Sequence, residues 1–156
     1  MKISDLLAEG LIIPDLKSEE GESALQEMVD FLKTTNLVAE EKELYARLLE
    51  REKLGTTAIG KGVAIPHCKF EGVKSPLVAL GVSRKGVDFE SADGKPVHIF
   101  FLVVAAPEEP SISLQILASI ARLVRKARAL GAKILQAQRP QSMLEVIRLE
   151  EQTIDE

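Results

Sequence analysis

His67 is the residue of this chain whose position most suggests chemistry. It follows Pro66 directly, after the short apolar run 63–65, in the stretch REKLGTTAIGKGVAIPHC. Pro66 has no N–H for a sheet ladder and pushes Ile65 into extended geometry, so we expect a strand that stops at the proline and a loop that begins with His67. Ligand sites in α/β proteins collect beyond the carboxyl ends of strands. An imidazole there can act as a nucleophile or change its charge near neutral pH.

The residues before His67 suit the binding of a phosphoryl group. Arg51 can donate parallel hydrogen bonds to phosphate oxygens, and the hydroxyls of Thr56 and Thr57 can donate one bond each. Glycines that allow close approach of the backbone stand in the same stretch, and they are Gly55, Gly60 and Gly62. A histidine in a surface turn, without catalytic function, is the alternative. The combination with a guanidinium, hydroxyls and glycines favours phosphoryl chemistry over that alternative.

The segment Gly55–Gly62, GTTAIGKG, almost matches the nucleotide-binding motif G-x-x-x-x-G-K-[ST]. Gly62 stands where that motif needs a hydroxyl to bind Mg²⁺. A phosphate-binding loop of this kind also opens into a helix, whereas this segment runs into the strand-like sequence VAIP. Both departures argue against nucleotide binding.

These residues resemble the enzyme IIA components of the fructose, mannitol and nitrogen-related class of the bacterial phosphotransferase system (PTS). The resemblance rests on Glu52, on Ile59-Gly60, and on VAIPH at 63–67, which is followed by Cys68 where the family usually has glycine. It extends through the REKLG segment at 51–55 and DGKPVHIFFLVVAAP at 93–107, and covers most of the chain. The REKLG segment and the lack of attached membrane segments look most like the stand-alone nitrogen-related branch.

The resemblance implies roles for individual residues. His67 matches the family histidine that accepts a phosphoryl group from a small HPr-like phosphocarrier and passes it to a cysteine of a IIB partner. Arg51 matches an arginine that helps bind the phosphoryl group. Family members usually carry a second histidine in an HL pair, whereas this chain has Ser113 before Leu114. The Ser113 hydroxyl can donate one hydrogen bond but cannot exchange a proton near pH 7, which affects onward transfer more than acceptance by His67.

Two functions remain open at this point. The first is a IIA-type phosphoryl carrier that accepts the group on His67 and donates it to a IIB cysteine. The second is a regulatory module whose phosphorylation state alters docking to a target protein, with weak or no onward transfer. The absence of the second histidine at Ser113 favours the second function, and the complete motif around His67 keeps the first. A degenerate relative of the fold without phosphorylation is a third, weaker alternative.

His98 and Cys68 are the other residues that could take part in chemistry, and we expect structural roles for both. His98 lies in the strand-like run PVHIFFLVV, where we expect a sheet histidine with a satisfied hydrogen bond. Cys68, next to His67, is a candidate reactive thiol, but a lone cysteine is more often a small apolar filler, and we expect that here. Two separated histidines and one cysteine match no zinc spacing, so we expect no metal site and no cofactor.

Composition indicates a single compact domain over residues 1–156, with 46% hydrophobic and 28% charged residues. The longest apolar run, 99–107, falls short of the ~20 residues that cross a bilayer. Asp5 and Glu9 interrupt any signal-peptide core, so we expect a cytoplasmic protein without membrane insertion. The net charge of −4 disfavours nucleic-acid binding and suits docking to a basic patch on a carrier. The sequence does not indicate an oligomeric state.

The elements that must position these residues indicate an α/β fold, a mixed β-sheet flanked by helices on both faces. Ser18 is expected to cap a helix whose apolar positions recur with helical spacing, at Leu25, Met28, Val29 and Leu32. A second helix over Glu40–Lys53, with Gly55 beyond its end, places Arg51 in its last turn. Further strands are expected at Leu77–Ser83 and Val97–Ala105, with turns at Lys85-Gly86 and Asp93-Gly94.

Helices are expected in the rest of the chain. Ser111 or Ser113 can cap a helix whose expected buried face comprises Ile116, Leu117, Ile120 and Val124. As a residue at a helix start, Ser113 is expected to be at least partly exposed. Gly131 permits a break before a shorter helix, and Pro140 opens a last one, in which Ser142 and Glu145 have capping-box spacing.

Overall fold

Two long antiparallel strands form the middle of the sheet in the computed structural model, which describes residues 1–155. They are β5, Leu77–Val87, and β6, Val97–Ala105, paired from Leu77 opposite Val104 to Val82 opposite Ile99. Every residue of β6 except His98 is buried. Such a continuously apolar strand requires cover on both faces of the sheet.

Four shorter strands complete a mixed sheet. β1 (Ile12–Ile13) runs parallel to β5, and β3 (Val63–Ala64) runs parallel to β6. β2 (Ala58–Gly60) pairs antiparallel with β3, and β4 (His67–Lys69) pairs parallel with β6. The order is β1-β5-β6-β3-β2, with β4 beside β6. The strand expected at Val97–Ala105 is therefore confirmed with its bounds, whereas β1, β2 and β4 were not anticipated.

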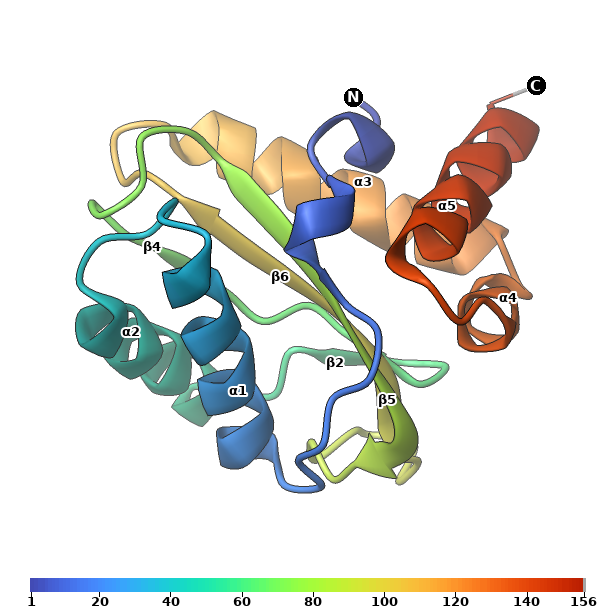
Figure 1. The fold of residues 1–156 in the computed structure, drawn as a ribbon, viewed down its shortest axis with the longest axis horizontal. Helices are drawn as coiled ribbons and strands as arrows, with labels where there is room; N and C mark the ends of the chain where they lie inside the picture. The colour runs from blue at the N-terminus through green and yellow to red at the C-terminus, as the bar shows by residue number, and fades with distance from the viewer. Residues whose placement is uncertain (156) are drawn as a thin grey trace.

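Helices cover both faces, as expected (Figure 1). The pair α1 (Gly21–Thr34) and α2 (Glu41–Lys53) lies on one side of β5 and β6. On the other side lie α3 (Pro110–Lys126), α4 (Leu130–Gln136) and α5 (Pro140–Ile154). Two short 3₁₀ helices, Ile3–Asp5 and Glu9–Leu11, precede β1. No helix within residues 1–155 is long and apolar enough to cross a membrane.

The start of α1 differs from the expected Ser18 cap. The helix begins at Gly21, and no side chain caps it. The Ser18 hydroxyl instead donates a 2.9 Å hydrogen bond to the carboxylate of Glu27, which also accepts the backbone N–H groups of Lys17 and Ser18. The apolar face predicted for this helix is confirmed, because its four named residues are buried.

Prolines, rather than serines, set the starts of α3 and α5. Pro110 and Pro140 occupy the first turns of these helices, where a fixed φ suits the helix and a missing N–H costs little. The expected caps at Ser111 or Ser113 are therefore wrong. The capping box of Ser142 and Glu145 is also absent, since both residues lie inside α5 and Glu145 pairs with Arg148 at 2.8 Å.

The glycine signals mark three different features. The expected turn at Asp93-Gly94 is confirmed by the 2.9 Å bond from the Gly94 N–H to the Ser91 carbonyl. The turn expected at Lys85-Gly86 is wrong, because β5 continues through Gly86 with a shift of register. Gly86 has a φ of 94°, and its N–H donates to the Ser83 hydroxyl at 2.9 Å. Gly131 lies inside α4, after a break at 127–129.

Candidate functional site

His67 lies in a short strand, and the loop expected to begin there is absent. Val63 faces Ile99 and Ala64 faces Phe100 in β3, and His67 faces Val103 in the same register in β4. Pro66 cannot donate to the ladder, but its carbonyl accepts the Val103 N–H at 2.9 Å. The proline therefore removes one ladder bond without ending the alignment with β6, and His67 is held by the sheet on a defined backbone.

The ring of His67 is oriented by the backbone next to it. Its Nδ1 atom lies 2.7 Å from the carbonyl oxygen of Ile65. A carbonyl oxygen can only accept a hydrogen bond, so Nδ1 carries the proton in this arrangement. Nε2 is then the unprotonated nitrogen of the neutral ring, with a lone pair available for attack on phosphorus.

Arg51 stands in the last turn of α2, as expected. Its Nη1 donates a 2.8 Å hydrogen bond to the carbonyl oxygen of Gly55, just beyond the helix. The side chain is half-buried, and the remaining guanidinium N–H groups are in a fixed planar fork. This bond ties the guanidinium to the segment between α2 and β2.

Glu52 and Thr57 form a polar contact behind Arg51. The carboxylate of Glu52 accepts the backbone N–H of Thr57 at 3.1 Å and also the Thr57 hydroxyl. Burial raises the pKa of Glu52, against the opposing effect of the Thr57 bonds and the nearby charges of Arg51 and His67. Thr57 is itself buried, and its hydroxyl is occupied by this contact. The sequence marked Glu52 only as part of the motif, without a structural role.

An open cavity of about 520 Å³ brings the central predicted residues together. His67, Arg51 and Ser113 all line it, on β4, α2 and α3 respectively. Ser113 is only 7% exposed, which corrects the expectation of an at least partly exposed residue. It lies one turn inside α3, facing the packed side of the helix, because Pro110 moves the helix start upstream. The cavity wall also includes Arg47, Glu50, Leu54, Cys68, Lys69, Pro110, Leu114 and Leu117.

Several lining residues were missed by the sequence analysis. Arg47 lies one helical turn before Arg51, and this i, i+4 spacing was the available signal. Leu54 and Leu114 are 82% and 67% exposed and line the same cavity as His67 and Arg51. Exposed leucines beside a charged cavity are typical of a surface that contacts another macromolecule.

Thr56 and two of the glycines lie away from this cavity. The Thr56 hydroxyl donates to the Phe89 carbonyl at 2.7 Å, and Thr56 lines a different cavity with Phe89. Gly60 and Gly62, with φ of 90° and 77°, belong to the hairpin of β2 and β3. A Cβ on Gly62 would be 3.8 Å from His98, so the hairpin packs near His98 and not around His67.

His98 and Cys68 have the structural roles that the sequence predicts. His98 is part-buried in β6, and its Nδ1 lies 2.8 Å from the carbonyl oxygen of Ser83. Cys68 is a half-buried free thiol packed against the core. Burial raises the pKa of Cys68 to about 12, so the thiol is protonated near neutral pH. In the described part of the chain, no three His, Cys, Asp or Glu side chains cluster in a way that could hold a metal ion.

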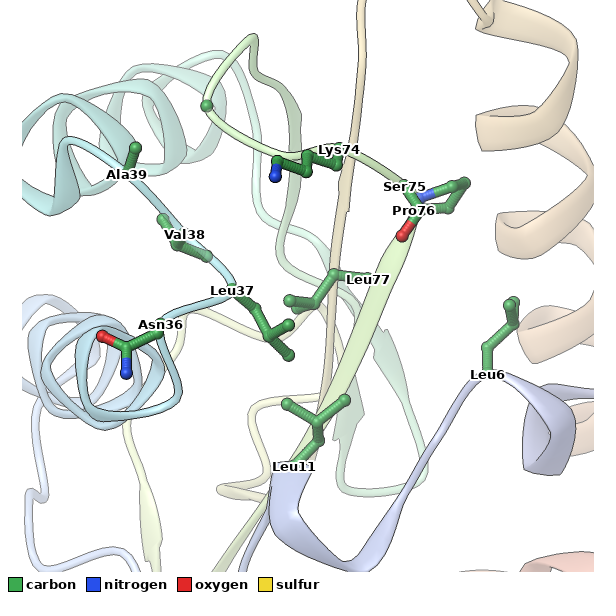
Figure 2. Close-up of a pocket in the computed structure, with 11 residues that line it drawn as sticks. Leu6, Leu11, Asn36, Leu37, Val38, Ala39, Lys74, Ser75, Pro76 and Leu77 are labelled. Carbon is green, nitrogen blue, oxygen red and sulfur yellow. The ribbon is translucent and has the colours of Figure 1, made fainter.

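A second cavity of about 510 Å³ has a different character (Figure 2). It lies between the 3₁₀ helices, the segment joining α1 to α2, and the segment before β5. Leu11, Leu37 and Leu77 point toward one another in it, and Lys74 is the one charged residue of its lining. Its wall contains no histidine, in contrast to the cavity at His67.

Comparison with known proteins gives concordant results. The family model for the phosphoenolpyruvate-dependent sugar phosphotransferase system, EIIA 2, matches residues 5–149. A nitrogen regulatory protein of Bradyrhizobium diazoefficiens is 42% identical over 126 residues, which cover 80% of this chain and 81% of that protein. The PTS fructose-specific EIIABC component of Bacillus subtilis is 32% identical over 147 residues, which cover 94% of this chain but only 23% of that protein.

The fold is shared with a solved structure. The crystal structure of nitrogen regulatory protein IIA-Ntr from Neisseria meningitidis superposes with a TM-score of 0.81 at 25% sequence identity. The superposition covers 93% of this chain and 98% of that one. The six-stranded mixed sheet with helices on both faces is therefore an arrangement seen in a IIA-type protein.

Proposed function

Because this chain belongs to the EIIA type 2 family of the phosphoenolpyruvate-dependent sugar phosphotransferase system, we propose that it is a phosphoryl carrier whose acceptor is Nε2 of His67. The observation that carries the proposal is the 2.7 Å contact between His67 Nδ1 and the Ile65 carbonyl. This contact selects the tautomer with a basic Nε2. The location of the ring in a cavity shared with Arg51 adds a cationic group for the phosphoryl oxygens.

The transfer step requires little from the protein besides position and charge. The Nε2 lone pair attacks the phosphorus of a phosphorylated carrier, and the bond between phosphorus and the carrier's nitrogen breaks as the new N–P bond forms. The electron pair of the broken bond stays on the carrier. The His67 ring gains positive charge, which the Ile65 carbonyl and the nearby Glu52 carboxylate stabilise. Arg51 binds the phosphoryl oxygens.

The partners follow from the family. The proposed donor is an HPr-like phosphocarrier, and the proposed acceptor is a cysteine of a IIB component. The exposed Leu54 and Leu114 beside His67 supply apolar area for docking either partner. We propose that residues 1–156 act as one IIA domain, because the family match spans nearly the whole sequence. We also propose that this domain acts in the cytoplasm.

A regulatory function is the second candidate. Ser113 on the wall of the cavity offers a hydroxyl where the family resemblance expects an imidazole. Two of the similar proteins are nitrogen regulatory proteins by name. In this alternative, phosphorylation of His67 adds about −1.5 to −2 charges beside the exposed leucines and changes docking to a target protein, with slow or no onward transfer.

Phosphorylation by a complete donor system tests acceptance. The wild-type protein is incubated with an HPr-like carrier, its phosphorylating enzyme and labelled phosphoenolpyruvate, and the bound label is measured. We expect an acid-labile, alkali-stable label that is lost in His67→Ala, while His98→Ala retains it. Equal labelling of wild type and a folded His67→Ala would exclude His67 as the acceptor. No label on the wild type would favour the degenerate relative of the fold.

Chasing the labelled protein with purified IIB components separates the two candidates. Rapid movement of the label to a IIB cysteine supports the carrier function. A label that stays on His67 while binding to a target protein changes supports the regulatory function.

A further inference from the structure

The cationic groups of the cavity at His67 are distributed unevenly between its walls. Arg47 and Arg51 are contributed by α2 and Lys69 by β4, whereas the residues of α3 on the wall are Pro110, Ser113, Leu114 and Leu117. The α3 wall therefore carries no charge among the residues described as lining the cavity. Among the described residues that line the cavity, the positive partners for a phosphoryl group on His67 therefore lie on α2 and β4.

Arg51 alone does not supply enough hydrogen-bond donors for a phosphoryl group on His67. One of its N–H groups is already bound to the Gly55 carbonyl at 2.8 Å. A phosphoryl group presents three acceptor oxygens and nearly two negative charges. Additional donors beside Arg51 would therefore strengthen the binding of the phosphoryl group.

Arg47 has the position and the freedom to provide those donors. It lies one helical turn from Arg51 on α2, so the two side chains start from the same face of the helix, and both residues line the cavity. Its charge also acts on the thiol of Cys68, the residue after His67, where it opposes the effect of burial on the pKa. The guanidinium of Arg47 is thus close to the strand that carries His67.

The present partner of Arg47 is weakly held. Its Nε lies 3.1 Å from a carboxylate oxygen of Glu43, and the two side chains are 49% and 54% exposed. An exposed pair of this kind is worth little and exchanges readily with a stronger partner. A phosphoryl dianion in the cavity, close to two arginines, is a stronger partner than a single solvated carboxylate.

We propose that Arg47 is a second phosphoryl-binding residue. Its guanidinium, on α2, donates hydrogen bonds to the phosphoryl oxygens in place of an imidazole on α3, which this chain lacks because Ser113 stands there. This inference rests on the proposed function, because it requires a phosphoryl group on His67. In the unphosphorylated protein Arg47 pairs with Glu43, and in the phosphorylated protein it moves to the phosphoryl oxygens.

The test uses phosphoramidate as a chemical phosphoryl donor, so that no partner protein is required. The rate of formation of phosphorylated His67 and its lifetime are measured by phosphorus NMR for the wild type, Arg47→Gln and Arg148→Gln. Arg148 is a matched control, since it is 48% exposed and pairs with Glu145 on α5, outside this cavity. We expect Arg47→Gln to slow phosphorylation by roughly tenfold and Arg148→Gln to leave the rate unchanged.

A double-mutant cycle with Ser113→His separates phosphate binding from a merely structural role. When an imidazole is present on α3, the loss caused by Arg47→Gln should shrink to within about twofold, because the two groups serve the same phosphoryl oxygens. An equal loss in both backgrounds, or no loss in either, would overturn the inference about Arg47. If the wild type gains no label on His67, the proposed function itself fails, which is a different result from a labelled wild type without any effect of Arg47.

Discussion

The carbonyl oxygen of Ile65 lies 2.7 Å from Nδ1 of His67, two residues later in the chain. Pro66, between them, restricts Ile65 to extended geometry, and its carbonyl accepts the Val103 N–H of β6. The pairing with β6 thus holds the backbone of His67, and the Ile65 carbonyl selects the protonated nitrogen of its ring. The remaining nitrogen, Nε2, is the one available for chemistry.

This contact predicts which nitrogen is modified. Phosphorylation of the wild type should give the Nε2 isomer of phosphohistidine, because Nδ1 is protonated and bound to a carbonyl. Nitrogen and phosphorus NMR of the labelled protein distinguish the two isomers. Modification at Nδ1 would show that the imidazole ring flips before reaction and that the Ile65 contact does not determine which nitrogen reacts.

Replacement of Arg51 by lysine should slow acceptance without unfolding the protein. Lysine keeps the charge but lacks the planar fork and its bond to Gly55, so we expect a loss of about 1–3 kcal/mol of transition-state stabilisation. That loss corresponds to a rate reduction of roughly 5- to 150-fold in single-turnover phosphorylation. Arg148→Lys on α5 serves as the control, and an unchanged rate in a folded Arg51→Lys would exclude a direct role.

The predictions that succeeded concern long segments with strong patterns. The strand Val97–Ala105 was predicted with its bounds because its residues are almost all apolar, and α2 was predicted to within one residue, with Gly55 marking its end. The position of Arg51 in the last turn of α2 follows from this helix prediction. That Arg51 and His67 line the same cavity was expected only from the resemblance to the family motif.

The failures depend on contacts between distant parts of the chain. The pairing of β4 with β6 is set by the register of β3, which a sequence window around Pro66 does not contain. Thr56 and Thr57 are adjacent in the chain, yet the hydroxyl of Thr56 bonds to the Phe89 carbonyl and that of Thr57 to Glu52. The burial of Ser113 results from packing of the first turn of α3 against the sheet. Tertiary packing decided each of these features.

The raised pKa of Glu52 predicts a pH dependence of stability. Burial, the largest cause, raises the pKa of this carboxyl in the folded protein, so the native state binds its proton more tightly than the unfolded chain does. Its contribution to stability is fully present below the unfolded pKa, about 4.3, and is lost as pH rises through the folded pKa. Glu52→Gln should therefore gain free energy of unfolding relative to the wild type as pH rises from about 4 to about 7. Urea denaturation across this range measures the difference, and parallel profiles for the two proteins would contradict the prediction.

Ser113→His tests the proposed effect of a serine at the position where the family resemblance implies an imidazole. Because Ser113 is 7% exposed, a larger side chain must displace its neighbours, and we expect a loss of stability near 1 kcal/mol, in contrast to the negligible effect expected for an exposed residue. The open cavity beside it leaves room for the ring to extend toward His67 and keeps the loss small.

If an imidazole on α3 supports departure of the phosphoryl group, the variant should transfer it from His67 to a IIB cysteine faster than the wild type does. Single-turnover transfer to the same IIB protein measures the ratio, with Ser111→His on the same turn of α3 as the control outside the cavity lining. Equal rates for wild type and Ser113→His would remove the main support for the regulatory function, because Ser113 would then be no obstacle to onward transfer.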